Sequence, residues 1–247
     1  LSPGSLVLVL DIGAGTTDLA LVRLDGGEGR AMPMAQLLRF AGRSLAERPG
    51  QQQRTAKVLG KAGISLGGRM IDRWWAKALG APEPAPQAWL NAAEALKCAL
   101  SETTSAQVVL ESEAGPRPLQ GSRRELNNVL DAAGLEQLLD GLLNEVEAAA
   151  RRAGESLDSI DAVMAVGGGS ALPWVQQWLQ RRLPKTELLV TQPLQAVVLG
   201  ALAMTPALQV MDVLQHGISL RCWDRRLQNQ RWHPLFLPGQ AWPTPQP

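Results

Sequence analysis

Unbroken runs of aliphatic residues at positions 6–10 and 160–166 are the clearest elements of the hydrophobic pattern. Runs of this kind, closed by aspartate or glycine, are typical of strands that a sheet buries on both faces. A second apolar segment at residues 19–24 follows the first after a turn rich in glycine and threonine, and this order predicts a β-hairpin. Shorter strands are predicted at residues 106–111 and 188–190.

Apolar residues at helical spacing predict the helices. The first begins after Gly67 and Gly68 and has an apolar face of Met70, Ile71, Trp74, Trp75 and Ala78. Ser122 followed by Glu125 is a capping-box signature and predicts the start of a long helical stretch. The remaining helical ranges are residues 87–101, 122–153 with a break at Gly134, 172–183 and 193–204.

Two segments lack a clear period. Residues 26–63 are polar around Pro49 and Gly50 and are interpreted as an inserted loop with room for one helix. From residue 210 onward, short strand-like runs alternate with tryptophan and proline, which indicates a linker or appendage with a small β element. A rigid connector is predicted at Pro82, Pro84 and Pro86.

Composition narrows the classes of partner. The chain has 24 basic and 23 acidic residues, so a nucleic-acid partner is not predicted. No apolar run reaches the roughly 18 residues of a membrane span. Cys98 and Cys222 lie far apart without a secretory signal, which favours a reduced, cytoplasmic protein. His216 and His233 stand in unrelated contexts, which argues against a zinc site.

The turn from Asp11 to Asp18, read Asp-Ile-Gly-Ala-Gly-Thr-Thr-Asp, is the strongest candidate for chemistry. Gly13 and Gly15 allow the backbone to turn sharply and to present N–H groups to an anion. Thr16 and Thr17 add hydroxyl donors, and Ala14 lies between the glycines. Two carboxylates on one hairpin can face a hydrated Mg²⁺. The alternative is an ordinary turn in which Asp and Gly serve only to reverse the chain. The buried strand that leads into these aspartate, glycine and threonine residues favours phosphate binding.

This octapeptide resembles the second phosphate-binding hairpin of the superfamily of actin, sugar kinases and heat-shock chaperones. Four further segments resemble the 70-kilodalton heat-shock chaperone family, in that family's order. They are Leu66-Gly67-Gly68 with Asp72, Glu94 with Lys97 and Ser101, Val166 to Pro173 with Gly167, Gly168 and Gly169, and Gln192-Pro193 with Gly200-Ala201.

The resemblance implies an α/β fold, the second lobe of an actin-like (ribonuclease H-like) ATPase, with a helical upper subdomain. Residues 1–68 and 121–206 are then the lobe base, residues 69–120 a small, mostly helical subdomain, and residues 207–247 a linker and the start of a β-rich appendage. The implied ligands are ATP or ADP with Mg²⁺. Unfolded clients or co-chaperones are the implied protein partners.

The resemblance also implies residue roles. Asp11 and Asp18 would hold the metal through water, and Thr16 would orient the attacking water, so these three are the catalytic candidates. The backbone of Gly13 to Thr17 would bind phosphate. Nucleoside contacts would come from Glu94, Lys97 and Ser101 on one side and Gly167, Gly168 and Gly169 on the other.

Several positions depart from the family pattern. Cys98 replaces an arginine that stacks on adenine, and Arg69 replaces an acidic residue. Gly169 stands where the family has serine, Ala171 where it has arginine, and Leu194 where it has aspartate. Only five residues precede the first strand, so the family's first lobe is expected to be absent and the chain, which begins with Leu1, is expected to be a fragment. Half of a phosphate clamp is not expected to hydrolyse ATP.

Three hypotheses stay open at this point. The first is the nucleotide-binding half of a divergent chaperone, active only with the missing lobe. The second is a degenerate module for regulation or protein interaction, which the lost adenosine contacts favour. Exposed Trp74, Trp75 and Trp89 would also favour it, but packing in the core is the favoured interpretation of these three. The third is another branch of the superfamily, such as a cell-division actin homologue or a sugar kinase. The predicted helix of Glu94 to Ser101 argues against this branch.

Overall fold

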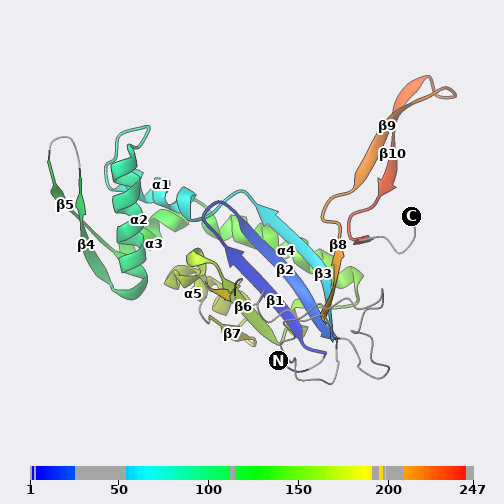
Figure 1. Ribbon diagram of the computed structural model, residues 1–247, viewed down its shortest axis with the longest axis horizontal. Helices are drawn as coiled ribbons and strands as arrows, with labels where there is room; N and C mark the ends of the chain where they lie inside the picture. Colours follow the sequence, from blue (N-terminus) through cyan, green and yellow to red (C-terminus); the bar gives the residue numbers. More distant parts are fainter. Residues whose placement is uncertain are drawn as a thin grey trace, which may run out of the picture.

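The computed structural model describes residues 4–25, 54–111, 115–190 and 208–242, together with Ser2 and positions 195, 196 and 198. Its centre is a seven-stranded mixed sheet in the order β11-β8-β3-β2-β1-β6-β7 (Figure 1). β1 to β3 are antiparallel, whereas β6 runs parallel to β1 and β8 parallel to β3. The strands are β1 Leu6–Ile12, β2 Thr17–Asp25, β3 Arg54–Ile64, β6 Ala162–Val166, β7 Glu187–Leu189, β8 Leu208–Val213 and β11 Ala241–Trp242.

One face of β1 supplies the centre of the core. Its alternate residues Leu6, Leu8, Leu10 and Ile12 are almost completely buried. Helix α4 (Leu135–Arg152) packs on β2 and β3 and brings apolar residues into the same core. A Cβ at Gly60 in β3 would lie 2.5 Å from the Cβ of Ala149 on α4, so glycine is what allows the helix to pack this closely on the strand. The apolar face of the strand, with a period of two residues, and that of the helix, with a period of 3.6 residues, thus pack together in one core.

A smaller unit stands beside the sheet and contains helices α1, α2 and α3 and a β-hairpin (Figure 1). Ser122 caps α3, because its hydroxyl accepts from the Glu125 amide while its own amide donates to the Glu125 carboxylate. Trp75 and Trp89 are buried and Trp74 is partly buried against the core, which confirms the favoured interpretation of these tryptophans as core residues. The bounds are α1 Gly68–Ala78, α2 Gln87–Glu102, β4 Ser105–Leu110, β5 Arg117–Ser122 and α3 Arg123–Ala132.

The predicted helices and strands agree with the structure at most positions. One expectation fails, because the last part of the predicted loop at residues 26–63 is strand β3. Its alternation is hidden in the sequence by Gly60 and Gly63. Strand β5 was also not predicted. The helix predicted at residues 193–204 and the greater part of the 26–63 segment lie outside the described residues.

The segment from residue 208 onward forms two different structures. β8 joins the main sheet beside β3, and Lys61 on β3 donates to the Asp212 carboxylate at 2.9 Å. β9 (Ile218–Asp224) and β10 (Asn229–Phe236) then form a separate two-stranded sheet that projects away from the rest of the protein (Figure 1). Among the described residues, no helix combines the length and apolar character that a bilayer crossing requires.

Candidate functional site

Asp11 and Asp18 lie opposite each other where β1 and β2 meet their turn. The register of the antiparallel pair places their Cα atoms as direct partners. Asp11 is half-buried and Asp18 is exposed. Partial burial, and next the charge of Asp18, raise the pKa of the Asp11 carboxyl above its ordinary value. The folded protein therefore disfavours the ionised pair, and stability falls as pH rises from the ordinary carboxyl range through the raised pKa of Asp11.

The turn between the two aspartates presents free backbone donors. Gly13 donates its amide back to the Thr16 carbonyl at 3.0 Å and closes the turn. Ala14, Gly15 and Thr16 are exposed, and their amides donate no hydrogen bond to any other described residue. A Cβ on Gly15 would meet no atom within 4 Å, so the turn is open on its outer side. Consecutive free amides at an open turn form an anion-binding concavity.

Helix α1 supports this turn from behind. The amides of Gly68 and Arg69 donate to the carbonyls of Gly13 and Ala14, each at 2.9 Å. The first amides of a helix have no partner within the helix, and here they use the turn as their cap. A Cβ at Gly67 would lie 2.6 Å from the Gly13 oxygen and 2.7 Å from the Gly15 nitrogen, so only glycine permits this approach. The turn is therefore held in place before any ligand arrives.

Thr17 has a role that the sequence did not indicate. Its side chain is completely buried, and its hydroxyl donates to the Leu66 carbonyl at 2.7 Å. This bond ties β2 to the segment that enters α1. A contact of Thr17 with phosphate stays a prediction and would have to come from its backbone, whereas Thr16 faces solvent.

The second glycine turn, Gly167 to Gly169, lies beside Asp11. β1 and β6 are parallel with Asp11 in register with Val166, so their carboxyl ends meet at one edge of the sheet. Gly167 has a φ of +77°, and a Cβ there would collide with the Asp11 carboxylate and the Ile12 carbonyl. Gly169 is packed against Ile12 in the same way. The Asp11–Asp18 turn and the Gly167–Gly169 turn, which are distant in sequence, thus lie together at one edge of the sheet.

Helix α2 reaches the start of α1 through Lys97. The Lys97 ammonium forms a buried ion pair with Asp72 on α1 at 2.6 Å and lies 3.5 Å from the Gly68 carbonyl. Burial raises the pKa of the Asp72 carboxyl, and the hydrogen bond and charge of Lys97 act in the opposite direction. Lys97 therefore joins α2 to the helix that supports the turn. Its predicted contact with a nucleotide stays a prediction.

The other predicted residues of α2 lie apart from the turn. Glu94 and Cys98 are exposed, and the Ser101 hydroxyl donates within its own helix to the Lys97 carbonyl at 3.2 Å. Within the described residues, neither Glu94 nor Ser101 makes a hydrogen bond or ion pair to the Asp11–Asp18 turn or to Gly167–Gly169. Leu194 lies outside the described residues.

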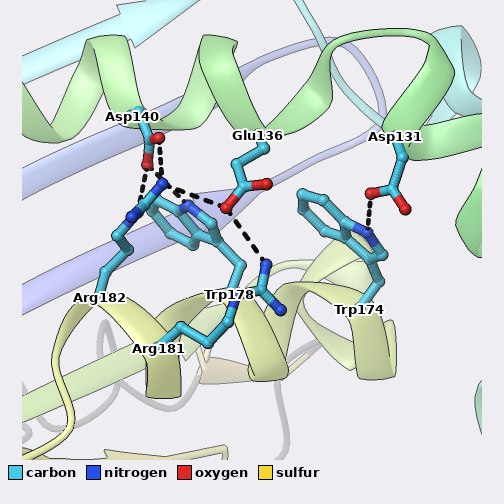
Figure 2. A network of polar contacts seen from close by, with 7 residues as sticks. All are labelled: Asp131, Glu136, Asp140, Trp174, Trp178, Arg181 and Arg182. Atoms are coloured by element: carbon cyan, nitrogen blue, oxygen red, sulfur yellow. Dashed lines mark hydrogen bonds and ion pairs between the residues drawn. The ribbon is translucent and has the colours of Figure 1, made fainter.

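Helix α5 (Pro173–Arg182), which follows the second glycine turn, is held by a polar network (Figure 2). The indole N–H groups of Trp174 and Trp178 donate to Asp131 on α3 at 2.7 Å and to Asp140 on α4 at 3.0 Å. Arg182 donates to Asp140 with two nitrogens, at 2.7 and 2.5 Å. Burial acts to raise the pKa of Asp140, but the hydrogen bonds from Arg182 and Trp178 and the nearby charges hold it below its ordinary value. The network thus ties the helix that follows the second glycine turn to α3 and α4.

A magnesium ion fits the aspartate pair by charge and donor type. Carboxylate oxygens are the donors that Mg²⁺ accepts, usually with several retained waters. Burial and, to a smaller extent, the charge of Asp18 raise the pKa of Asp11, and a bound cation would offset that charge. Within the described ranges no group of three or more His, Cys, Asp or Glu gathers as a metal site, so a direct all-protein cage is not formed there. Asp11 and Asp18 would therefore hold the ion through its water shell, and the ion would supply positive charge beside an anion on the turn.

Comparison with known proteins identifies the family. A model described as Hsp70 protein matches residues 82–217, more than half of the chain. This chain belongs to the Hsp70 protein family. It is 31% identical over 192 residues to "Chaperone protein dnaK1" of Prochlorococcus marinus strain MIT 9313, which covers 77% of this chain and 26% of that protein.

Two other relatives agree with this assignment. "Chaperone protein HscA homolog" of Acidithiobacillus ferrooxidans strain ATCC 53993 is 26% identical over 221 residues, 86% of this chain and 32% of that protein. "Chaperone protein DnaK" of Methanothermobacter thermautotrophicus is 24% identical over 204 residues, 79% of this chain and 31% of that protein. The chain thus spans about a quarter to a third of the length of these relatives.

The Hsp70 assignment confirms the resemblance inferred from the motifs and the predicted fold class, an α/β lobe of the actin-like type. It also decides against a cell-division actin homologue or a sugar kinase. The sequence analysis named Gly67 and Asp72 only as parts of a family segment, without a role in supporting the turn, and it did not single out Gly63. These roles depend on contacts with the distant residues Gly13, Lys97 and Asp18.

Proposed function

We propose that the Asp11–Asp18 turn and the Gly167–Gly169 turn bind the phosphates and nucleoside of ATP or ADP with Mg²⁺. The observation that carries this proposal is the run of three free, exposed amides at Ala14, Gly15 and Thr16 between two carboxylates. An anion alone would be repelled by the aspartates. A magnesium–phosphate group would satisfy both the amides and the carboxylates.

In this proposal each element has a definite task. Asp11 and Asp18 hold the water shell of Mg²⁺, and the amides of the turn hold phosphate oxygens. Thr16, whose side chain is exposed, orients the attacking water. Bound Mg²⁺ supplies charge neutralisation on the phosphates. Glu94, Lys97 and Ser101 are the proposed contacts of the nucleoside from α2, opposite Gly167, Gly168 and Gly169.

We further propose that this lobe does not hydrolyse ATP without a second phosphate-binding wall. Phosphoryl transfer depends on positioning and charge neutralisation from both sides of the transferred group. The described residues supply the turn of β1 and β2, which is one side. Calorimetry on this chain should give a Kd for MgATP of about 100 µM or weaker. Binding costs several kcal/mol of translational and rotational freedom of the ligand, and few contacts are present to offset that cost. Nanomolar affinity would overturn this half of the proposal.

The decisive variant is Asp18→Asn in the full-length protein. Steady-state ATPase activity should fall by at least about tenfold, because a neutral amide cannot organise the metal's water shell as a carboxylate does. The melting temperature should change little, since Asn is nearly isosteric and Asp18 is exposed. Asp25→Asn, at the exposed far end of the same strand, is the matched control and should leave turnover unchanged. Appreciable, unchanged turnover in Asp18→Asn would remove this residue from the mechanism.

A second candidate is a nucleotide-independent module of an Hsp70 protein that binds a client or co-chaperone. The exposed Cys98 favours it, because a thiol offers no planar cation to stack on adenine. In this case Asp18→Asn should leave partner binding intact, and there should be no MgATP-dependent turnover to lose.

A further inference from the structure

Arg69 is the first residue of helix α1 that carries a side chain. Gly67 and Gly68 precede it and are buried against the Asp11–Asp18 turn. The Arg69 amide donates to the Ala14 carbonyl at 2.9 Å, so the backbone of this residue lies directly on the turn. Its side chain has no part in the contacts that hold the turn in place.

The guanidinium of Arg69 is a free positive charge. The side chain is exposed, and it makes no hydrogen bond or ion pair with any other residue that the structure describes. The ion pairs of α1 involve other residues, Asp72 with Lys97 and Lys77 with Glu83. The charge of Arg69 is therefore available to a ligand on the neighbouring turn.

The position of Arg69 on its helix favours a contact with such a ligand. The Cα–Cβ bond of a helical residue is tilted toward the start of its helix, and the start of α1 is the end that meets the turn. The carbonyls of Gly13 and Ala14 accept from α1, which leaves the free amides on the open side of the turn. Arginine carries its guanidinium on a long, flexible stem, so it can extend around the turn to an anion held on that side.

Lys97, the other cation beside the turn, is less available. Its ammonium is buried and paired with Asp72 at 2.6 Å, and it lies 3.5 Å from the Gly68 carbonyl. A contact between Lys97 and a phosphate would weaken this pairing and leave the buried Asp72 carboxylate with less compensation. Arg69 can bind a phosphate without a comparable loss.

We propose that Arg69 binds a phosphate group of the nucleotide and supplies a positive charge that the Asp11–Asp18 turn itself lacks. Guanidinium and phosphate form short, charge-assisted hydrogen bonds, often two in parallel. The two aspartates repel a phosphate chain, and Arg69 offsets this repulsion together with Mg²⁺. The resemblance to the chaperone family leads one to expect an acidic residue at this position, so the charge beside the turn is reversed in this chain. The inference rests on the proposed nucleotide site and assigns it a further residue that recognises the phosphates.

The experiment is calorimetry of MgATP and MgADP with the full-length protein. Arg69→Gln should weaken binding of both ligands by about fivefold or more, because a charge-assisted contact is lost. Arg73→Gln is the matched control, since it removes the same charge one helical turn farther from the phosphates and Arg73 is likewise exposed. The control should change either affinity by less than about twofold. Equal loss in the two variants shows a general effect of net charge and overturns the proposal, as does unchanged affinity in Arg69→Gln.

Two further measurements separate a phosphate contact from a structural role of Arg69. Arg69→Lys keeps the charge and should lose less than about threefold in affinity, so a loss as large as that of Arg69→Gln overturns the proposal. The affinity of the wild type should also fall more steeply with added salt than that of Arg69→Gln, and equal slopes contradict a charge contact. The melting temperature of each variant should match that of the wild type, because the side chain is exposed and unpaired among the described residues.

The same titrations distinguish failure of this assignment from failure of the nucleotide site. If the wild type binds MgATP and Arg69→Gln binds it equally well, only the role of Arg69 is wrong. If the wild type does not bind MgATP, the proposed nucleotide site is wrong and the role of Arg69 is wrong with it.

Discussion

The hairpin of β1 and β2 lies in the middle of a seven-stranded sheet, whereas the hairpin of β9 and β10 stands alone and projects from the protein (Figure 1). In the first, the strands are buried and the turn is open, so backbone amides are the groups offered to a ligand. In the second, the strands themselves are exposed, so side chains and strand edges are offered. The same local structure therefore presents different groups to its surroundings, and burial decides which groups these are.

The two turns also differ in their support. Helix α1 donates two amides to the first turn, and α1 is itself joined to α2 by the Lys97–Asp72 ion pair. The turn between β9 and β10 is held by its own side chains, since the Asp224 carboxylate accepts from two amides and the Gln228 side chain donates to the Arg225 carbonyl. A rigid turn suits a small anion whose oxygens need fixed donors.

The largest expected effect concerns the support of the first turn. Lys97→Met should destabilise the protein by about 3–5 kcal/mol, because it leaves the Asp72 carboxylate buried without its partner. Lys97→Met/Asp72→Leu should recover most of this loss, since apolar residues of similar volume often replace a buried pair well. Chemical denaturation of the single and double variants measures both quantities.

The same double variant tests the role of Lys97 in ligand binding. If Lys97 contacts the nucleotide, as predicted from the motif, the double variant should bind MgADP more weakly than the wild type even though its stability is restored. If the double variant binds MgADP as the wild type does, Lys97 has a purely positioning role, through α1 and the turn. Calorimetry with MgADP on the wild type and the double variant distinguishes the two.

A matched pair of substitutions compares the two hairpins directly. Leu8 in β1 is 0% exposed and Leu220 in β9 is 55% exposed. Leu8→Ala should cost about 2–5 kcal/mol through lost burial and the cavity left behind. Leu220→Ala should change stability by no more than about 0.5 kcal/mol. Denaturation midpoints that shift equally would show that β9 is covered in solution, against the description of an open surface.

The smallest expected effect is electrostatic and depends on pH. The pKa of Asp140 is held below its ordinary value, so its stabilising contribution is present above the unfolded-state pKa of about 3.9 and is lost as pH falls through the lower folded-state pKa. Asp140→Asn should therefore lower stability at pH 7 by about 0.2–1 kcal/mol, and the difference should fade near pH 3. Asp158→Asn, whose ion pair with Lys185 is almost fully exposed, should have no measurable effect at either pH. A difference for Asp140→Asn that persists unchanged in acid would contradict the linkage.

Much of the fold could be predicted from local pattern. The aliphatic run of β1, the apolar stripe of α1 and the capping box at Ser122 each have a physical cause within a few residues, and the structure confirms all three. Strand β3 was missed because its glycines serve distant partners. Gly60 makes room for Ala149 on α4, and a Cβ at Gly63 would lie 2.5 Å from the Asp18 carboxylate. Local alternation cannot show a residue that is small because of a neighbour far along the chain.

By itself, the sequence determined which groups could handle a phosphate, because Asp11, Gly13, Gly15 and Thr16 stand within one short turn after a buried strand. It also determined the family, through motifs in a characteristic order. Only the tertiary structure decided that α1 closes against that turn, that Thr17 faces the interior, that Lys97 is paired with Asp72, and that the tryptophans of β9 and β10 are exposed while Trp75 is buried. The reason is that donor type and backbone freedom are properties of single residues, whereas burial and pairing depend on which distant segments the sheet brings together.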